Sequence, residues 1–245
     1  MQSRIRRTPA VEVRLAAVRP ADALTSLLDA DERARLTEYH RDDDRDRFAT
    51  GRALARATLS EVTGRPLADL RINARCRQCG GAHGQPVVAE LPDARLSISH
   101  AGDHVLVAVT EGISIGVDIE RVDATTFAGF DDIALAPGER ADTATERATI
   151  WTRKEAILKA TGHGLSIEPS RLRVSSADEL PALRAWSAIE KGPDEITLHD
   201  LSAPEGYVAA LAVLAEGVPG PTVSDGDALL TAAAGSAGPG RRSTR

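Results

Sequence analysis

A short stretch of alternating apolar and polar residues in the middle of the chain places the strongest constraint on the fold. Residues 113–120 read ISIGVDIE, so every second side chain is isoleucine or valine. Successive side chains of a β-strand point to opposite faces, so this pattern predicts a strand with one buried face. Asp118 and Glu120 then emerge side by side on the other face. Neighbouring carboxylates repel each other unless a cation lies between them, which makes a hard metal ion their natural partner. If the strand instead ends near Val117, both acids are simply solvated.

A helix predicted over about residues 143–161 favours the metal interpretation. At about 100° per residue, one stripe of this helix carries Ala144, Ala148, Trp151, Glu155 and Leu158. Glu155 therefore occupies a position that the pattern reserves for the core. Lys159 lies one turn further on and could form an ordinary surface pair with Glu155, worth about 0.3–0.5 kcal/mol. That pairing does not explain why Glu155 shares an edge with Trp151. A third inward carboxylate would complete an oxygen-ligand site for Mg²⁺, and the lysine beside it would supply a cation for phosphate oxygens.

The rest of the chain reads as helices and strands on both sides of residue 112. The first part predicts a strand at 11–15, helices between 29 and 61, a short strand at 70–74 and a hairpin over 96–109. The second part predicts strands at 113–119, 172–174, 186–189 with 196–198, and 207–214. We therefore expect an α+β protein with an N-terminal lobe over residues 1–112 and a C-terminal lobe over 113–216. Residues 217–245 are rich in Gly, Pro, Ser and Ala, which predicts a flexible tail.

Composition excludes several classes of protein. The 245 residues carry a formal net charge of -6, and aromatic residues make up 3% of the chain. A general nucleic-acid binder needs a basic face and usually stacking aromatic residues, so we expect no nucleic-acid partner. No stretch resembles a signal peptide or a membrane span, which predicts a protein of the reducing cytoplasm without a membrane partner. Only three of the 30 basic residues are lysines, namely Lys154, Lys159 and Lys191.

Two motifs in order resemble the paired signature of the 4'-phosphopantetheinyl transferases. They are GVDIE at Gly116–Glu120 and, about 30 residues later, WTRKEAILK at Trp151–Lys159. Three upstream segments are also similar to that family: SISH at Ser97–His100, GQP at Gly84–Pro86, and the basic helix Arg47–Arg56. The resemblance spans roughly residues 27–215, and the length matches the two-lobed type that serves surfactin-like synthetases.

This resemblance implies two pseudo-symmetric α+β lobes with the active site, and coenzyme A, in the cleft between them. The implied enzyme moves 4'-phosphopantetheine from coenzyme A to a serine of an acyl or peptidyl carrier protein in polyketide or nonribosomal peptide synthesis. Asp118, Glu120 and Glu155 would bind Mg²⁺. Glu155 would serve as or share the general base, and Lys159 would stabilise or protonate the leaving group. The implied contacts of coenzyme A are Arg47, Arg52, Gly84, Gln85, Pro86, Ser99, His100, Asp118, Glu155 and Lys159. We expect a monomer.

Some positions depart from the family pattern, and other interpretations stay open. Gln85 stands where the family has lysine, and the segment 135–139, which ends in Glu139, only loosely resembles F-x-x-x-E. Arg47 and Arg52 could instead form a solvated face with Asp42, Asp43, Asp44 and Asp46. A different Mg²⁺-dependent nucleotide transferase or hydrolase could use the same carboxylates. A non-catalytic module could bind zinc through Cys76, Cys79 and His83, although a structural zinc site needs four ligands.

Overall fold

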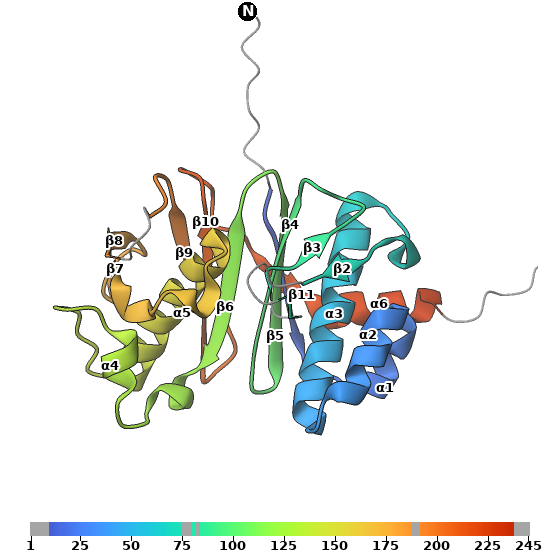
Figure 1. Cartoon of the computed structure of the whole chain (residues 1–245), viewed down its shortest axis with the longest axis horizontal. Helices are drawn as coiled ribbons and strands as arrows, with labels where there is room; N and C mark the ends of the chain where they lie inside the picture. Colours follow the sequence, from blue (N-terminus) through green and yellow to red (C-terminus); the bar gives the residue numbers. More distant parts are fainter. Residues whose placement is uncertain (1–9, 75–79, 82–83, 188–191, 238–245) are drawn as a thin grey trace, which may run out of the picture.

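The computed structural model describes residues 10–74, 80–81, 84–187 and 192–237. Its sheets and helices confirm the predicted α+β class (Figure 1). The N-terminal lobe contains a four-stranded sheet with the order β11 (Val223–Asp225), β1 (Glu12–Ala17), β5 (His104–Glu111) and β4 (Ala94–Ala101). The C-terminal lobe contains a three-stranded sheet with the order β6 (Ile115–Arg121), β10 (Tyr207–Val213) and β9 (Thr197–Leu201).

Each lobe packs one long helix against its sheet. These helices are α3 (Asp42–Thr63) in the N-terminal lobe and α5 (Ala144–Thr161) in the C-terminal lobe, on opposite sides of the strands in Figure 1. The shorter helices are α1 (Ala21–Leu24), α2 (Ala30–Arg35), α4 (Phe130–Ala134) and α6 (Gly226–Ala237). Two small sheets pair β2 (Ile72–Asn73) with β3 (Val87–Val88), and β7 (Leu172–Val174) with β8 (Leu183–Trp186).

Local sequence explains where α5 begins and ends. The side chain of Thr143 accepts a hydrogen bond from the Glu146 backbone amide, and the Glu146 side chain accepts one from the amide of Thr143, which is a complete capping box. The helix stops at Gly162, whose φ of 76° lies in the left-handed region that favours glycine. The predicted helix over 143–161 is therefore confirmed almost to the residue.

Strand β6 decides between the two interpretations of the acidic pair. It extends to Arg121, and Asp118 is paired with Ala210 of β10 in the middle of the antiparallel ladder. Glu120 is paired with Val208 in the same ladder. The alternative in which the strand ends near Val117 is therefore wrong, and both carboxylates project from a regular strand.

The expectation of a flexible tail over 217–245 is wrong for residues 223–237. Strand β11 pairs in parallel with β1, and α6 packs against α3 and β1. Leu230 is fully buried in the N-terminal core, and the Asp227 carboxylate accepts hydrogen bonds from the Ala17 amide and from Arg19. This segment of small residues folds because Leu230 packs into the core and because Asp227 forms an ion pair with Arg19. Residues 238–245 lie outside the described part of the chain.

One hydrophobic core is shared by both lobes. It joins Val13 and Leu106 of the N-terminal sheet to Val117, Ile119 and Leu211 of the C-terminal sheet. The alternating apolar residues of the stretch 113–120 therefore face this shared core, which holds the two sheets together. Among the described residues, no helix has the length and apolar character needed to cross a membrane.

Candidate active site

The edge strands β4 and β6 meet where the two lobes join, and Asp118 lies at this junction. Its side chain is buried, with 5% of the residue exposed. Asp118 Oδ1 accepts a hydrogen bond from Ser99 Oγ of β4 at 2.7 Å and one from Lys159 Nζ of α5 at 2.6 Å. Lys159 Nζ also donates to Ser99 Oγ at 2.9 Å. Three residues that are 41 and 60 positions apart in sequence therefore form one compact polar group.

Gly116 lets α5 approach β6 closely enough to form this group. A Cβ atom at residue 116 would lie 2.1 Å from the Ala156 carbonyl oxygen and 2.4 Å from the Ala160 backbone nitrogen. Real Cβ contacts are never that short, so only glycine permits this packing. The glycine of the GVDIE motif thus has a direct structural reason, because it brings the helix that carries Glu155 and Lys159 against the strand that carries Asp118.

Glu155 is the most perturbed acid of the site. The residue is 8% exposed, and within the described part of the chain its Oε1 atom has no hydrogen-bond partner. Burial, together with the negative charges of Asp118 and Glu120, raises the pKa of Glu155 to about 7, against the opposing positive charge of Lys159. A buried carboxylate with a free acceptor atom is poised to take either a proton or a cation.

Glu120 belongs to the same electrostatic group. Burial raises its pKa, the Asp118 charge adds to that effect, and the hydrogen bond from the Arg121 amide and the charge of Lys159 oppose it. Its Oε1 atom accepts that amide hydrogen bond at 2.8 Å. Across the described residues, no three His, Cys, Asp or Glu side chains are arranged so that they could hold a metal ion as they stand. The metal site at Asp118, Glu120 and Glu155 therefore stays a prediction.

Two nitrogen-bearing side chains of the N-terminal lobe, Arg47 and His100, lie near the same junction. Arg47 Nη1 donates to the Gly102 carbonyl at 3.2 Å in the turn between β4 and β5, and Arg47 Nη2 donates to Asp44 Oδ1 at 2.8 Å. His100 lies at the end of β4 and keeps part of its surface exposed. Partial desolvation of its ring by the surrounding protein lowers its pKa, and the positive charges of Lys159 and Arg47 lower it further. The structure therefore brings Arg47, His100 and Lys159 within electrostatic reach of one another, as an anion site would require.

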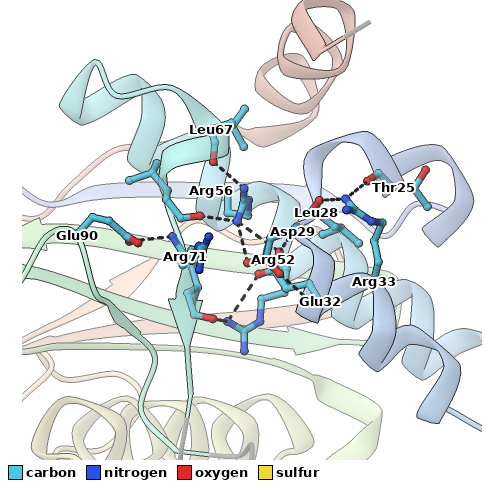
Figure 2. Close-up of polar contacts among 12 residues, drawn as sticks. Thr25, Leu28, Asp29, Glu32, Arg33, Arg52, Arg56, Leu67, Arg71 and Glu90 are labelled. Carbon is cyan, nitrogen blue, oxygen red and sulfur yellow. Dashed lines mark hydrogen bonds and ion pairs between the residues drawn. The ribbon is translucent and has the colours of Figure 1, made fainter. Parts of the chain in front are cut away.

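Arg52 belongs to a different group of side chains, shown in Figure 2. Its Nη1 atom donates to the Ile72 carbonyl at 3.2 Å and lies 4.0 Å from Glu32 Oε1, and its guanidinium lies over the Phe48 ring. Burial lowers the pKa of Arg52. The neighbouring Arg56 is also buried and forms an ion pair with Glu32. These contacts tie α3 to α2 and β2, so the structure does not group Arg52 with Arg47.

The segment Gly84–Pro86 reaches the C-terminal end of α5. The Gly84 amide donates to the Ala74 carbonyl at 2.6 Å, and Gln85 Nε2 donates to the Lys159 carbonyl at 3.5 Å. Pro86 is half-buried. The glutamine that replaces the family's lysine thus touches the helix that carries Lys159. The possible zinc ligands Cys76, Cys79 and His83 lie outside the described residues.

Two buried cations of α5 lie outside the residues that the sequence predicts for the site. Lys154 Nζ donates to the Ala134 carbonyl at 2.6 Å and pairs with Glu139, whose other oxygen accepts from the Val174 amide at 2.7 Å. Burial lowers the pKa of Lys154, and Glu139 opposes that shift. Arg153 pairs with Asp200 at 2.6 Å. Both cations are fully buried, and they anchor the helix directly before Glu155. The sequence does contain a signal for this burial. Arg153 and Lys154 are adjacent, so a helix that packs against the protein core cannot easily turn both side chains toward water.

Comparisons with known proteins match most of the chain, but β1, β11 and α6 lie outside the two matching family models. A family model described as "4'-phosphopantetheinyl transferase, N-terminal" matches residues 19–112, and one described as "4'-phosphopantetheinyl transferase superfamily" matches residues 114–212. The chain is 28% identical to the 4'-phosphopantetheinyl transferase ffp of Bacillus subtilis, over 60% of this chain and 65% of that protein. It is 25% identical to Sfp of Bacillus subtilis (strain 168), over 58% and 63%, and 26% identical to HetI of Nostoc sp., over 70% and 76%. The match thus spans slightly less than two thirds of ffp and of Sfp.

Proposed function

The chain belongs to the 4'-phosphopantetheinyl transferase superfamily, and we propose that it transfers 4'-phosphopantetheine from coenzyme A to a serine of an acyl or peptidyl carrier protein. The serine oxygen forms a bond to phosphorus, the pyrophosphate bond of coenzyme A breaks, and 3',5'-adenosine bisphosphate leaves. The observation that carries this proposal is the junction where Asp118 and Lys159 contact Ser99 of β4, with Glu155 within electrostatic reach of both charges. Transfer of a phosphoryl-type group asks mainly for positioning and charge neutralisation, which such a junction can supply.

Side chains from both lobes would bind the phosphates of coenzyme A. Arg47 and His100 lie on the N-terminal side and Lys159 on the C-terminal side. A ligand that carries several phosphates would therefore bridge the lobes. Lys159 would also stabilise the negative charge that develops on the leaving phosphate, because its ammonium group is held at the junction by Asp118 and Ser99.

Mg²⁺ would be held by Asp118, Glu120 and Glu155. The donor chemistry fits, since all three are carboxylates, burial and the Asp118 charge raise the pKa values of Glu120 and Glu155, and Glu155 Oε1 lacks a partner among the described residues. When bound, the ion would neutralise the pyrophosphate. Glu155 would serve as or share the general base toward the carrier serine, because its buried Oε1 atom has no hydrogen-bond partner among the described residues.

We further propose a monomeric protein of the reducing cytoplasm that acts in polyketide or nonribosomal peptide synthesis. The net charge of -6 and the 3% aromatic content support the absence of a nucleic-acid partner. The three named relatives are all 4'-phosphopantetheinyl transferases, which supports coenzyme A and carrier proteins as the partners.

Incubation with coenzyme A and an apo carrier protein tests the proposal. Mass spectrometry should show the addition of one 4'-phosphopantetheine group to the carrier, only when Mg²⁺ is present. Asp118→Ala and Glu155→Ala should each lower the rate at least about a hundredfold, because each removes a group that stabilises developing charge. Glu111→Ala is the matched control, since Glu111 is exposed at the end of β5 farthest from the β4–β5 turn.

Two outcomes would count against this assignment. An Asp118→Ala variant with full turnover would remove the metal site. Release of product from coenzyme A without any carrier would favour a hydrolase on the same carboxylates.

A further inference from the structure

Strands β4 and β6 run side by side at the junction of the lobes, but no backbone ladder joins them, because each is an edge strand of a different sheet. Two serine side chains of β4 form hydrogen bonds to β6 where a backbone ladder would otherwise join the strands. Ser97 Oγ accepts a hydrogen bond from the Val117 amide at 3.0 Å, and Ser99 Oγ accepts one from the Ile119 amide at 3.3 Å. We call these two contacts the serine seam. From Ser97 to Ser99 the partner amide moves from Val117 to Ile119, so residue numbers rise in the same direction on both strands. The two strands are therefore parallel.

The seam is buried. Ser97 is 5% exposed and Ser99 is 6% exposed, while Val117 and Ile119 lie in the core that the lobes share. Buried backbone amides need an acceptor, and here the acceptors are hydroxyl groups of the opposite lobe. The alternating serines of the SISH segment therefore have a structural reason that does not depend on a ligand.

Ser99 uses its whole hydrogen-bonding capacity inside the protein. A hydroxyl group has one donor and two acceptor positions. Ser99 Oγ donates to Asp118 Oδ1, and it accepts from the Ile119 amide and from Lys159 Nζ. These contacts hold an acid and a cation of the candidate active site in place. The contact with coenzyme A that the family resemblance implies for Ser99 stays a prediction.

We propose that Ser97 and Ser99 are positioning residues that align the two lobes for the transfer reaction. They replace the missing backbone ladder, so that Arg47 and His100 of one lobe keep a fixed place relative to Asp118 and Lys159 of the other. This inference rests on the proposed function, because alignment matters for a substrate that bridges both lobes.

Ser97 offers the cleaner test of the two. Ser97 Oγ accepts a hydrogen bond from the Val117 amide, whereas Ser99 Oγ also forms hydrogen bonds with Asp118 and Lys159. Ser97→Ala removes the acceptor without touching a residue proposed to bind substrate or metal. The matched control is Thr110→Val, since Thr110 is equally buried at 5% and its hydroxyl donates to the Ala10 carbonyl within the N-terminal lobe. Ser97→Thr is the conservative variant that keeps a hydroxyl.

Steady-state transfer kinetics are measured well below the melting temperature of each variant. For Ser97→Ala we expect kcat/KM for coenzyme A to fall at least tenfold while KM for the carrier protein stays within twofold. Thr110→Val should change both values less than twofold, and Ser97→Thr should recover most of the loss. Amide hydrogen exchange should show faster exchange at Val117 in Ser97→Ala only.

The outcomes separate this inference from the proposed function. An inactive wild-type protein, tested with a panel of apo carriers, overturns the function and with it the alignment. An active wild type whose Ser97→Ala variant transfers as fast as Thr110→Val overturns the inference alone. Equal losses in Ser97→Ala and Thr110→Val, or unchanged exchange at Val117, overturn it as well.

Discussion

At the scale of single residues, the scarcity of lysine marks two positions with distinct chemistry. Arginine supplies nearly all the positive charge of this chain, yet Lys154 and Lys159 are retained. Lys159 places a compact ammonium group between Asp118 and Ser99, where a planar guanidinium would not fit the same contacts. Lys154 is fully buried against Glu139 and a backbone carbonyl, so its role is to anchor α5. The same residue type thus serves the site at one position and the fold at the other.

Glu155 should make the stability of the metal-free protein depend on pH. Its folded-state pKa of about 7 exceeds the ordinary value of 4.5, so folding favours the protonated form. That contribution is fully present below about pH 4.5 and is lost as the pH rises through 7, and it amounts to roughly 3 kcal/mol. Glutamine does not titrate, so we expect the free energy of unfolding of Glu155→Gln not to fall in this way as the pH rises. Urea unfolding of both proteins in the presence of a chelator, between pH 4.5 and 7.5, measures the difference.

Glu32 titrates in both proteins and cancels in that comparison, whereas Glu120 interacts with Glu155 and contributes part of the difference. Parallel stability curves for the wild type and Glu155→Gln would contradict the raised pKa of Glu155.

At the scale of elements, the packing of α5 on β6 builds the site. Periodicity in the sequence predicts both elements, and the structure confirms them as Ala144–Thr161 and Ile115–Arg121. Periodicity does not say how close they come. That distance is set by Gly116, where the helix backbone occupies the space that a side chain would need.

Gly116→Ala should therefore disrupt the element pair. Its methyl group would meet the Ala156 carbonyl at 2.1 Å, so the helix must move away from the strand. We expect a loss of about 3 kcal/mol or more, at the upper end of overpacking, and a loss of transfer activity. Thermal unfolding and the carrier assay measure both effects. Gly235→Ala in α6 is the control, since a Cβ atom there meets nothing within 4 Å and should be neutral or slightly stabilising. Equal melting temperatures for the two variants would refute the close approach.

At the scale of the whole molecule, the C-terminal segment of the described chain packs against the N-terminal lobe. After the C-terminal sheet is complete, β11 and α6 join the N-terminal lobe through β1, Arg19 and Asp227. The N-terminal lobe is therefore built from both ends of the described chain, and the shared core ties it to the C-terminal sheet. We expect the two lobes to unfold together as one cooperative unit.

Leu230→Ala tests whether the C-terminal segment is part of that unit. Leu230 is fully buried, so its truncation should cost about 2–5 kcal/mol in the free energy of unfolding. Leu180→Ala is the matched control, because Leu180 is 87% exposed and should change stability by less than about 0.5 kcal/mol. Urea unfolding compares the two variants. A flexible tail would make the Leu230 variant as stable as the control.

Features that depend on neighbouring residues could be predicted from the sequence alone. The alternation of 113–120, the helical period of 143–161 and two spaced motifs were enough for the main elements, the α+β class and the family. The side chains that meet across the lobes could not be predicted in this way and are known from the packed fold. It separated Arg52 from Arg47, joined Asp227 to Arg19 over 208 residues, and paired the serines of β4 with amides of β6. Local periodicity reports which face of an element is buried, but the partner on that face depends on how distant segments pack.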